Sequence, residues 1–487
     1  MSLSPKTTAK APFDNVKADV ILCTSDDVQF YVWAIILAEA SHVFRDMFSL
    51  PQPTTSSGTP IIVLSEDSET LDVLLRLCYP VRDPSLTDLT MLGKVWEAAR
   101  KYELDEGAEI IANAVRSFLS TRPLHVFAIA CGLGVEEESR LAAEAWKASE
   151  TFKSISSLED PDTFERTIAG ASYIPEMANL PSGAFYRLLS FLRSSPDSDI
   201  SLCGTPTQHY PSPDDIKTPL VFDVPCPADV DVVIRASDGM DFPVHSLILR
   251  SASAEGLLDY SKTRTKVRAG SLPIVQVQAP SDILVELLRL CYPMNSPTID
   301  DCSKIRQMLR FASLHKMTKV TEVLKKRVAD ILQVYPVRHF FIAIEQGWKD
   351  VAQDAARNAA KHPIDDVYTL EMEDIPAAVY YSLLQYHRFY TTTVADVSSR
   401  HINQPWRWEV TTRMSKLGLA RLIAISKSLT PIPSIVVVDA LQKAFTADEE
   451  TSASKAPINL SRLITAGEEI ITEIERETSR VVGTWLD

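Results

Sequence analysis

Leu74-Leu-Arg-Leu-Cys-Tyr-Pro80 recurs without a change as Leu287-Leu-Arg-Leu-Cys-Tyr-Pro293. The two copies lie 213 residues apart, and a long internal repeat indicates the architecture of a chain before any local pattern does. The flanking sequence repeats as well, because Asp19–Phe48 aligns without a gap with Asp231–Tyr260. The chain is therefore a tandem duplication of one long unit, followed by a tail.

The duplication divides the 487 residues into parts, and each copy is long enough to bury a core of its own. A stretch rich in Pro, Ser and Thr separates the copies and predicts a linker. We expect a flexible N-terminus at 1–16, a first core at 17–120 with a helical extension at 121–193, a linker at 194–227, a second core at 228–333 with an extension at 334–390, and a partly helical tail at 391–487.

Composition excludes several classes of partner. The net charge is −15 and no basic stripe is visible, which argues against direct binding to nucleic acid or to an anionic membrane. No apolar run is long enough to cross a bilayer, and Met1–Pro12 has no signal-peptide core. We therefore expect a cytoplasmic or nuclear protein.

The sequence contains no recognisable catalytic, cofactor or metal-binding motif. Gly132-Leu-Gly134 is half of a phosphate loop, but the acidic run that follows it disfavours a bound anion. Dispersed cysteines without a C-x-x-C pair indicate buried or inert thiols in a reducing compartment. We predict a non-enzymatic protein without cofactor or metal. The seven cysteines are Cys23, Cys78, Cys131, Cys203, Cys226, Cys291 and Cys302.

Each copy begins with a pattern typical of a small sheet. Two short runs rich in β-branched residues flank a turn, Asp26-Asp27 in the first copy and Asp238-Gly239 in the second, and Asp-Gly is a strong hairpin signal. A third run follows a polar loop in each copy. The predicted strands are Val20–Thr24, Val28–Val32 and Ile61–Leu64, and then Val232–Ala236, Met240–Val244 and Ile274–Val277.

The repeated heptapeptide itself predicts a helix. Leu71, Leu74, Leu75 and Cys78 recur at the spacing of one helical face, and Tyr79-Pro80 ends the helix because proline cannot continue it. The sequence thus predicts an α+β fold dominated by helices. Further helices are expected at Ala34–Ala38, Ser41–Met47, Leu86–Arg100, Asp105–Leu119, Pro123–Cys131 and Glu136–Ala148.

These residues resemble the BTB/POZ family, whose opening combines Asp-Val, a hairpin, Phe-Pro-x-His and Ser-x-x-Phe-x-x-Met-Phe. Each copy supplies part of this signature. The first copy has Trp33 where the family has His, and the second has Gly256 near the position of the Phe. The matching residues are Asp19, Phe44, Met47 and Phe48 in the first copy, and Asp231, Phe242, Pro243 and His245 in the second.

The ending of the heptapeptide is similar to BTB proteins abundant in basidiomycete fungi, and Val126–Gly134 resembles the start of a BACK-type helical extension. The resemblance implies protein–protein interaction rather than chemistry. Family members commonly dimerise through their first helices, and some recruit cullin ubiquitin ligases or corepressors. The candidate interaction surface, which simple core packing explains about equally well for any one residue, is Ile35, Ile36, Leu37, Leu247, Ile248 and Leu249.

Three hypotheses remain open. The chain is a scaffold whose units pair within the chain or homodimerise, a substrate adaptor of a cullin ligase, or a transcriptional co-regulator acting through partners. The adaptor hypothesis is weakened because Ser49–Thr59 and Ser261–Leu272 lack the Glu that cullin-binding members usually carry there. His245 is interpreted as structural, because a required base or ligand would hardly be replaced by Trp33.

The tail carries its own pattern. Gln404–Trp408 places two tryptophans in a polar segment, and an amphipathic stripe follows within Leu460–Val482. The stripe covers the second unit or docks a partner helix. Its members are Leu463, Ile464, Ile470, Ile471 and Ile474.

Overall fold

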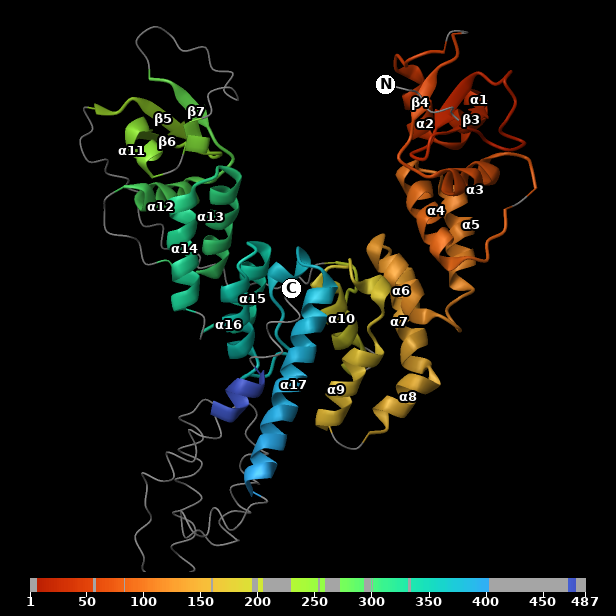
Figure 1. The fold of residues 1–487 in the computed structure, drawn as a ribbon. Helices are drawn as coiled ribbons and strands as arrows, with labels where there is room; N and C mark the ends of the chain where they lie inside the picture. Colours follow the sequence, from red (N-terminus) through yellow and green to blue (C-terminus); the bar gives the residue numbers. More distant parts are fainter. Residues whose placement is uncertain are drawn as a thin grey trace, which may run out of the picture. The chain divides into compact units, whose positions relative to one another are not determined.

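The chain forms two compact units, Met1–Pro206 and Thr207–Asp487, which are described separately (Figure 1). The boundary between them falls within the predicted linker. The structure, a computed structural model, describes residues 7–55, 58–82, 84–158, 161–194, 200–204, 229–252, 255–258, 272–292, 299, 301–331, 334–402 and 472–478.

Unit 1 begins with a four-stranded sheet in the order β1-β3-β2-β4. The predicted hairpin is present: β2 and β3 are antiparallel, and Asp27 at the turn takes the left-handed conformation with φ 60°. Strand β4 joins β2 in parallel, with Ile21 opposite Ile61. The strands are β1 Thr7–Thr8, β2 Val20–Cys23, β3 Val28–Val32 and β4 Ile61–Val63.

The N-terminal segment belongs to this sheet, although the sequence predicted a flexible stretch over 1–16. Thr7 pairs in parallel with Val28, and Phe13 is fully buried. The Phe13 ring packs 5.8 Å from the ring of Phe30 and edge-on, at 5.3 Å, to Tyr79. A two-residue strand has no periodicity that a sequence pattern can reveal, so the described part of this segment was missed.

Helices make up the rest of unit 1, in two groups. The first group packs with the sheet and contains the predicted heptapeptide helix, α3. The second group forms the extension, in which only α6 and α7 were placed from the sequence. The helices are α1 Ala34–Ala40, α2 His42–Ser49, α3 Ser68–Cys78, α4 Leu89–Lys101, α5 Asp105–Arg116, α6 Pro123–Gly132, α7 Glu136–Ala148, α8 Glu150–Ser156, α9 Pro161–Ala171, η1 Pro175–Met177 and α10 Ser182–Arg193.

Unit 2 has a three-stranded sheet in the order β6-β5-β7, with the same pairing as β3-β2-β4 of unit 1. Figure 1 shows this sheet with α11 next to the helices that follow it. The elements are β5 Val232–Arg235, β6 Asp241–Val244, α11 Ser246–Ser251, η3 Glu255–Leu258, β7 Ile274–Gln276, α12 Ser281–Cys291, α13 Cys302–Leu314, α14 Thr318–Asp330, α15 Pro336–Glu345, α16 Lys349–Ala359, η5 Leu370–Glu373 and α17 Ala377–Ile402.

Unusual backbone conformations recur at equivalent positions of the two units. Glu103 and Lys316 both have positive φ, 50° and 55°, directly after the helix that they end. The hairpin turn uses Gly239 where unit 1 uses Asp27, and glycine adopts this conformation without steric cost. The two units therefore share the backbone conformation of single residues at these positions.

The described part of the tail packs on unit 2. Residues 472–478 are helical, and Ile474 and Thr478 are buried. Arg400 of α17 forms ion pairs with Glu473 and Glu477, at 3.1 and 3.0 Å. Within the described residues, 472–478 therefore contact α17 of the same unit. The remaining tail residues that were singled out, Trp406, Trp408, Leu463, Ile464, Ile470 and Ile471, lie outside the described residues, as does Cys226.

Candidate interaction surface

The start of α1 is held by two side chains from distant parts of unit 1. Asp19 Oδ1 accepts a hydrogen bond from the backbone N–H of Ala34 at 2.8 Å. The hydroxyl of Tyr79 accepts from the backbone N–H of Trp33, also at 2.8 Å. These contacts satisfy donors that the first turn of a helix leaves without partners. The Tyr of the heptapeptide thus does more than end α3, because it fixes where α1 begins.

Unit 2 repeats both contacts at α11. Asp231 Oδ1 accepts from the N–H of Ser246 at 2.6 Å, and the Tyr292 hydroxyl accepts from the N–H of His245 at 2.9 Å. Desolvation acts to raise the pKa of Asp231, but hydrogen bonds from Ser246 outweigh it, so this pKa lies below its ordinary value. His245 Nδ1 also lies 3.0 Å from the Tyr292 hydroxyl.

This geometry explains how Trp33 can stand in place of a histidine. The contact common to both units uses the backbone N–H at this position, and any residue except proline supplies that donor. His245 lies beside the Tyr292 hydroxyl. The contacts of Tyr292 and Asp231 with the backbone N–H groups of His245 and Ser246 hold the start of α11 in place.

The six candidate surface residues divide into three pairs. Ile35 and Leu247, at equivalent positions, expose 69% and 73% of their surface. Ile36 and Ile248 are half-buried. Leu37 and Leu249 are fully buried, which corrects their assignment to the surface. A helix packed on a sheet turns only part of its circumference outward, so three successive apolar residues cannot all be exposed.

Charges beside the exposed pair differ in sign. Glu39 follows Ile35 by four residues on α1, and Arg250 follows Leu247 by three residues on α11. Both are exposed, and these spacings place each charge on the same helical face as its apolar neighbour. The two units therefore present similar apolar side chains next to opposite charges.

The remaining signature residues of unit 1 build the core around α2. Phe44 is fully buried and stacks on Tyr102, with ring centroids 4.6 Å apart, and on Phe48 at 5.8 Å. Met47 beside them is half-buried. In the hairpin of unit 2, Phe242 is buried and Pro243 is exposed on β6. These residues maintain the fold.

Unit 2 builds the same region without the aromatic side chain. Gly256 stands where Phe44 stands in unit 1, and a Cβ added to it would lie 2.1 Å from the carbonyl oxygen of His315. His315 Nδ1 lies 3.1 Å from the carbonyl oxygen of Gly256. A short 3-10 helix replaces α2, and its backbone lies directly against the end of α13. The departure from the family signature is thus compensated within the unit.

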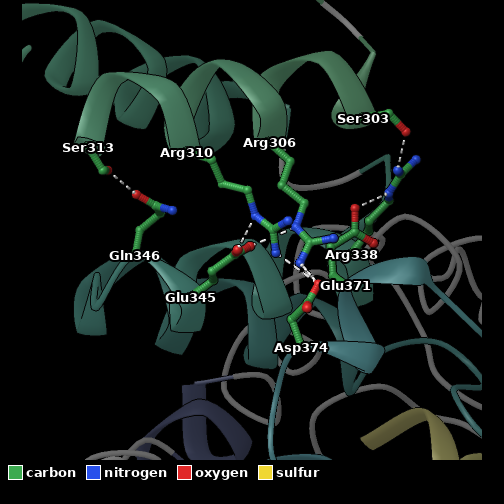
Figure 2. A network of polar contacts seen from close by, with 9 residues as sticks. All are labelled: Ser303, Arg306, Arg310, Ser313, Arg338, Glu345, Gln346, Glu371 and Asp374. Atoms are coloured by element: carbon green, nitrogen blue, oxygen red, sulfur yellow. Dashed lines mark hydrogen bonds and ion pairs between the residues drawn. The ribbon is translucent and has the colours of Figure 1, made fainter. Parts of the chain in front are cut away.

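A cluster of ion pairs joins the core of unit 2 to its extension (Figure 2). Arg306 and Arg310 of α13 reach Glu345 at the end of α15, each at 2.7 Å, and both also reach Asp374. At the position of Arg306, unit 1 has Gly93, where a Cβ would lie 3.3 Å from the side chain of Ile129. Sequence reasoning missed this cluster because charges spaced along a helix usually mark a solvated face.

The pair formed by Arg338 and Glu371 in unit 2 has a longer counterpart in unit 1. Arg338 of α15 binds Glu371 at 2.9 Å and the hydroxyl of Ser303 at 2.7 Å. At the equivalent positions of unit 1, His125 Nε2 lies 3.6 Å from Glu176. Both units thus place a basic side chain beside a glutamate here, an arginine in unit 2 and a histidine in unit 1. Arg338, Glu371 and Ser303 all belong to unit 2, so their contacts stabilise the junction between its core and its extension.

Three of the cysteines have raised thiol pKa values and are therefore poor nucleophiles. Burial raises the pKa of Cys78 to about 11, of Cys302 to about 11 and of Cys291 to about 12, so these thiols are protonated at neutral pH. Cys302 also lies 3.4 Å from the buried Nε2 of His339. Within the residues that the structure describes, no three His, Cys, Asp or Glu side chains gather in a way that could hold a metal ion.

The BTB/POZ domain family matches residues 12–118, a range that begins beside the buried Phe13 and ends just after α5. Residues 12–118 are similar to BTB/POZ domains. BTB/POZ domains act as protein–protein interaction modules. The matched range contains the whole of α1 with its exposed Ile35, and it does not extend to the second copy. No curated protein matches the chain.

None of the helices in the described part of the chain is both long enough and apolar enough to cross a membrane.

Proposed function

We propose that this chain is a non-enzymatic protein–protein interaction scaffold with two BTB-like units, and that α1 of one unit pairs with α11 of the other. The BTB/POZ match at residues 12–118 supports the first unit. The second unit is supported by its strand pairing, which repeats that of β3-β2-β4, and by the equivalent Asp231 and Tyr292 contacts. Pairing occurs within one chain or between two copies.

One observation carries the pairing: equivalent helices expose Ile35 beside Glu39 and Leu247 beside Arg250. Two copies of α1 would bring like charges together, and so would two copies of α11. An α1–α11 contact brings Glu39 towards Arg250 and buries both apolar side chains.

The charge of the two cores agrees with mixed pairing. Residues 17–120 contain sixteen acidic and eight basic residues, whereas residues 228–333 contain twelve acidic and fifteen basic residues. The first core is therefore net negative and the second net positive. Long-range attraction favours their association and like-charge repulsion disfavours pairing of two first cores.

Light scattering with hydrodynamic sizing on the full chain tests the apolar part of the proposal. Leu247→Asp should lower the mass if two 54.1 kDa chains pair, or enlarge the radius of a monomer if pairing is internal. Leu314→Asp is the matched control, since Leu314 lies in the same unit and is also 73% exposed. Ile35→Asp should act like Leu247→Asp. If Leu247→Asp and Leu314→Asp both behave like the wild type, the proposal fails.

A charge swap tests the mixed pairing directly. Glu39→Arg alone and Arg250→Glu alone should each weaken association at low salt, and the double variant should restore it. Each effect should be modest, about 0.2–1 kcal/mol, because the charges are exposed. If the double variant is weaker than both single variants, the units do not pair in this way. Recovery of a cullin or a corepressor with the full chain would instead support the adaptor or co-regulator hypothesis.

A further inference from the structure

Part of the predicted linker is docked on the extension of unit 1. Residues 200–204 follow α10 in sequence, yet the side chain of Leu202 is fully buried. Both carboxylate oxygens of Glu136, at the start of α7, accept from the backbone N–H of Leu202, and Oε2 also accepts from the N–H of Cys203 at 2.8 Å. The hydroxyl of Ser201 donates to the same carboxylate at 3.1 Å. This segment, residues 200–204, is called the strap below.

Two arginines hold the other side of the strap. The buried Arg187 of α10 donates through Nε to the carbonyl oxygen of Leu202 at 3.0 Å. Arg140 of α7 donates to the carbonyl oxygen of Ile200 at 2.9 Å. A short irregular segment with so many contacts has a fixed position, so a side chain that it carries meets the same neighbours each time the strap docks.

The docked strap brings Cys203 next to Cys131. Cys131 lies near the end of α6, is buried, and donates to the carbonyl oxygen of Leu202, the residue before Cys203, at 3.8 Å. The two thiols interact electrostatically. Cys203 is half-buried and lies 3.2 Å from the hydroxyl of Ser139. The two cysteines are 72 positions apart in sequence and meet only because residues 200–204 dock here.

The electrostatics of the pair are asymmetric. The hydrogen bond from Cys131 lowers the pKa of Cys203, while contact with Cys203 and burial raise the pKa of Cys131. Of the two thiols, Cys203 is therefore both the more acidic and the more accessible. That is the arrangement in which an accessible sulfur attacks and a second thiol resolves the product.

We propose that Cys131 and Cys203 are a reversible redox modification site, at which a small-molecule disulfide oxidises the pair to a disulfide that locks the strap onto α6 and α7. Oxidised glutathione is the representative oxidant. The Cys203 thiolate attacks one of its sulfurs, which forms a mixed disulfide and releases one glutathione thiolate. The Cys131 thiol then loses its proton and attacks the Cys203 sulfur, which releases the second glutathione. Two protein thiols are oxidised and one glutathione disulfide is reduced to two thiols.

The consequence concerns the connection between the units. In the reduced protein the strap is held by hydrogen bonds and one buried leucine, contacts that open locally on their own. A disulfide removes that opening, so the connection to unit 2 then begins at a covalently fixed point on unit 1. Oxidation thus shortens the length of chain over which the two units are tethered.

The experiment equilibrates the native full chain with oxidised and reduced glutathione at several ratios, blocks free thiols and maps disulfides by mass spectrometry. A peptide pair joining Cys131 to Cys203 is expected. Hydrogen exchange at Leu202 and Cys203 should slow by about tenfold or more on oxidation. Cys203→Ser should abolish both effects, and Cys78→Ser, a half-buried thiol of the same unit, should abolish neither.

Three results would overturn the proposal. One is recovery of Cys131 and Cys203 as free thiols at every ratio, and another is a stable mixed disulfide left on Cys203. The third is a disulfide from Cys203 to Cys226, and a Cys226→Ser variant checks that the expected pair forms without that cysteine.

Discussion

Unit 1 and unit 2 pack the segment after the first helix, α2 in unit 1 and η3 in unit 2, in different ways. Unit 1 fills it with two aromatic rings, Phe44 on Tyr102, at a centroid separation of 4.6 Å. Unit 2 closes it with backbone, because Gly256 lies against the carbonyl group of His315. The contact shows how unit 2 closes this region without an aromatic side chain.

The junctions between core and extension differ in the same manner. Apolar contact between Gly93 and Ile129 serves unit 1, and the four-residue ion-pair cluster around Arg306 serves unit 2. The two units therefore use different contacts at both positions. Substitutions that are harmless in one unit should therefore be damaging in the other.

Phe44→Ala should have the largest effect. Phe44 is fully buried between Tyr102 and Phe48, so its removal leaves a cavity in unit 1 and should cost about 3–5 kcal/mol. Hydrogen exchange on the full chain, followed over α2 to α5, measures the loss. Unit 2 serves as the internal control, because the variant should leave exchange in α12 to α14 unchanged. Equal loosening of both units would show that the regions are not independent.

Gly256→Ala should be almost as damaging, although it adds a single methyl group. That methyl carbon would lie 2.1 Å from a backbone oxygen, which cannot move without shifting the end of α13. We expect a loss of roughly 2–3 kcal/mol in unit 2. Urea denaturation and exchange over α13 measure it. Gly170→Ala is the control, since nothing lies within 4 Å of a Cβ there; a similar loss at Gly170 would contradict the steric explanation.

The same comparison shows what a sequence pattern can predict here. The hairpin and α3 were predicted because Asp238-Gly239 and the leucine spacing report on neighbours within a few residues. Contacts across long separations left no such signal. Tyr79 holds Trp33 across 46 positions, and the approach of Gly256 to His315 is visible only in three dimensions.

For the candidate surface, the sequence located the helix but could not identify which side faces outward. Ile35, Ile36 and Leu37 are alike in hydrophobicity, so composition alone cannot separate exposed from buried members. Packing decides: Leu37 is fully buried and Ile35 is exposed. The approach of Cys203 to Cys131 could not be predicted for a related reason, because the segment that carries Cys203 has the composition of a linker.

Arg306→Ala should weaken the charged junction of unit 2. Arg306 joins Glu345 and Asp374, and its side chain is only 11% exposed, so removal leaves partly buried carboxylates with fewer partners. The expected loss is roughly 2 kcal/mol. Arg310 pairs with the same two carboxylates, Glu345 and Asp374, but its side chain is 48% exposed. Arg310→Ala should therefore cost less than about 1 kcal/mol. Exchange in α15 measures both, and equal losses would refute burial as the cause.

Tyr79→Phe and Tyr292→Phe test the shared contact that places the first helix. Each removes the acceptor of one backbone N–H, that of Trp33 or His245, and should cost about 1 kcal/mol. Tyr292→Phe should cost slightly more, since His245 Nδ1 also loses its contact. Exchange at the start of α1 and α11 measures the effect. In contrast, Trp33→His should be nearly neutral, because the donor is the backbone; a large effect would assign a role to the indole.

Asp67→Asn should have the smallest effect at neutral pH and the clearest pH signature. Asp67 caps α3 by accepting from the N–H of Thr70, whereas Pro280, the residue before α12, offers no side-chain acceptor. Hydrogen bonds from Thr70, then from Lys94, lower the pKa of Asp67 from 3.8 to about 2. Because this pKa is lower in the folded state, the stabilisation is complete above about pH 4 and is lost as the pH falls towards 2.

Asparagine keeps an acceptor at the cap but cannot titrate, so the variant should lose less than about 1 kcal/mol at pH 7. Between pH 4 and pH 2, exchange over α3 should then accelerate less in the variant than in the wild type. Exchange over α12 should not differ between the two proteins, because the substitution lies in unit 1. If α3 of the variant keeps the full acid dependence, then carboxylates other than Asp67 govern the acid stability of this helix.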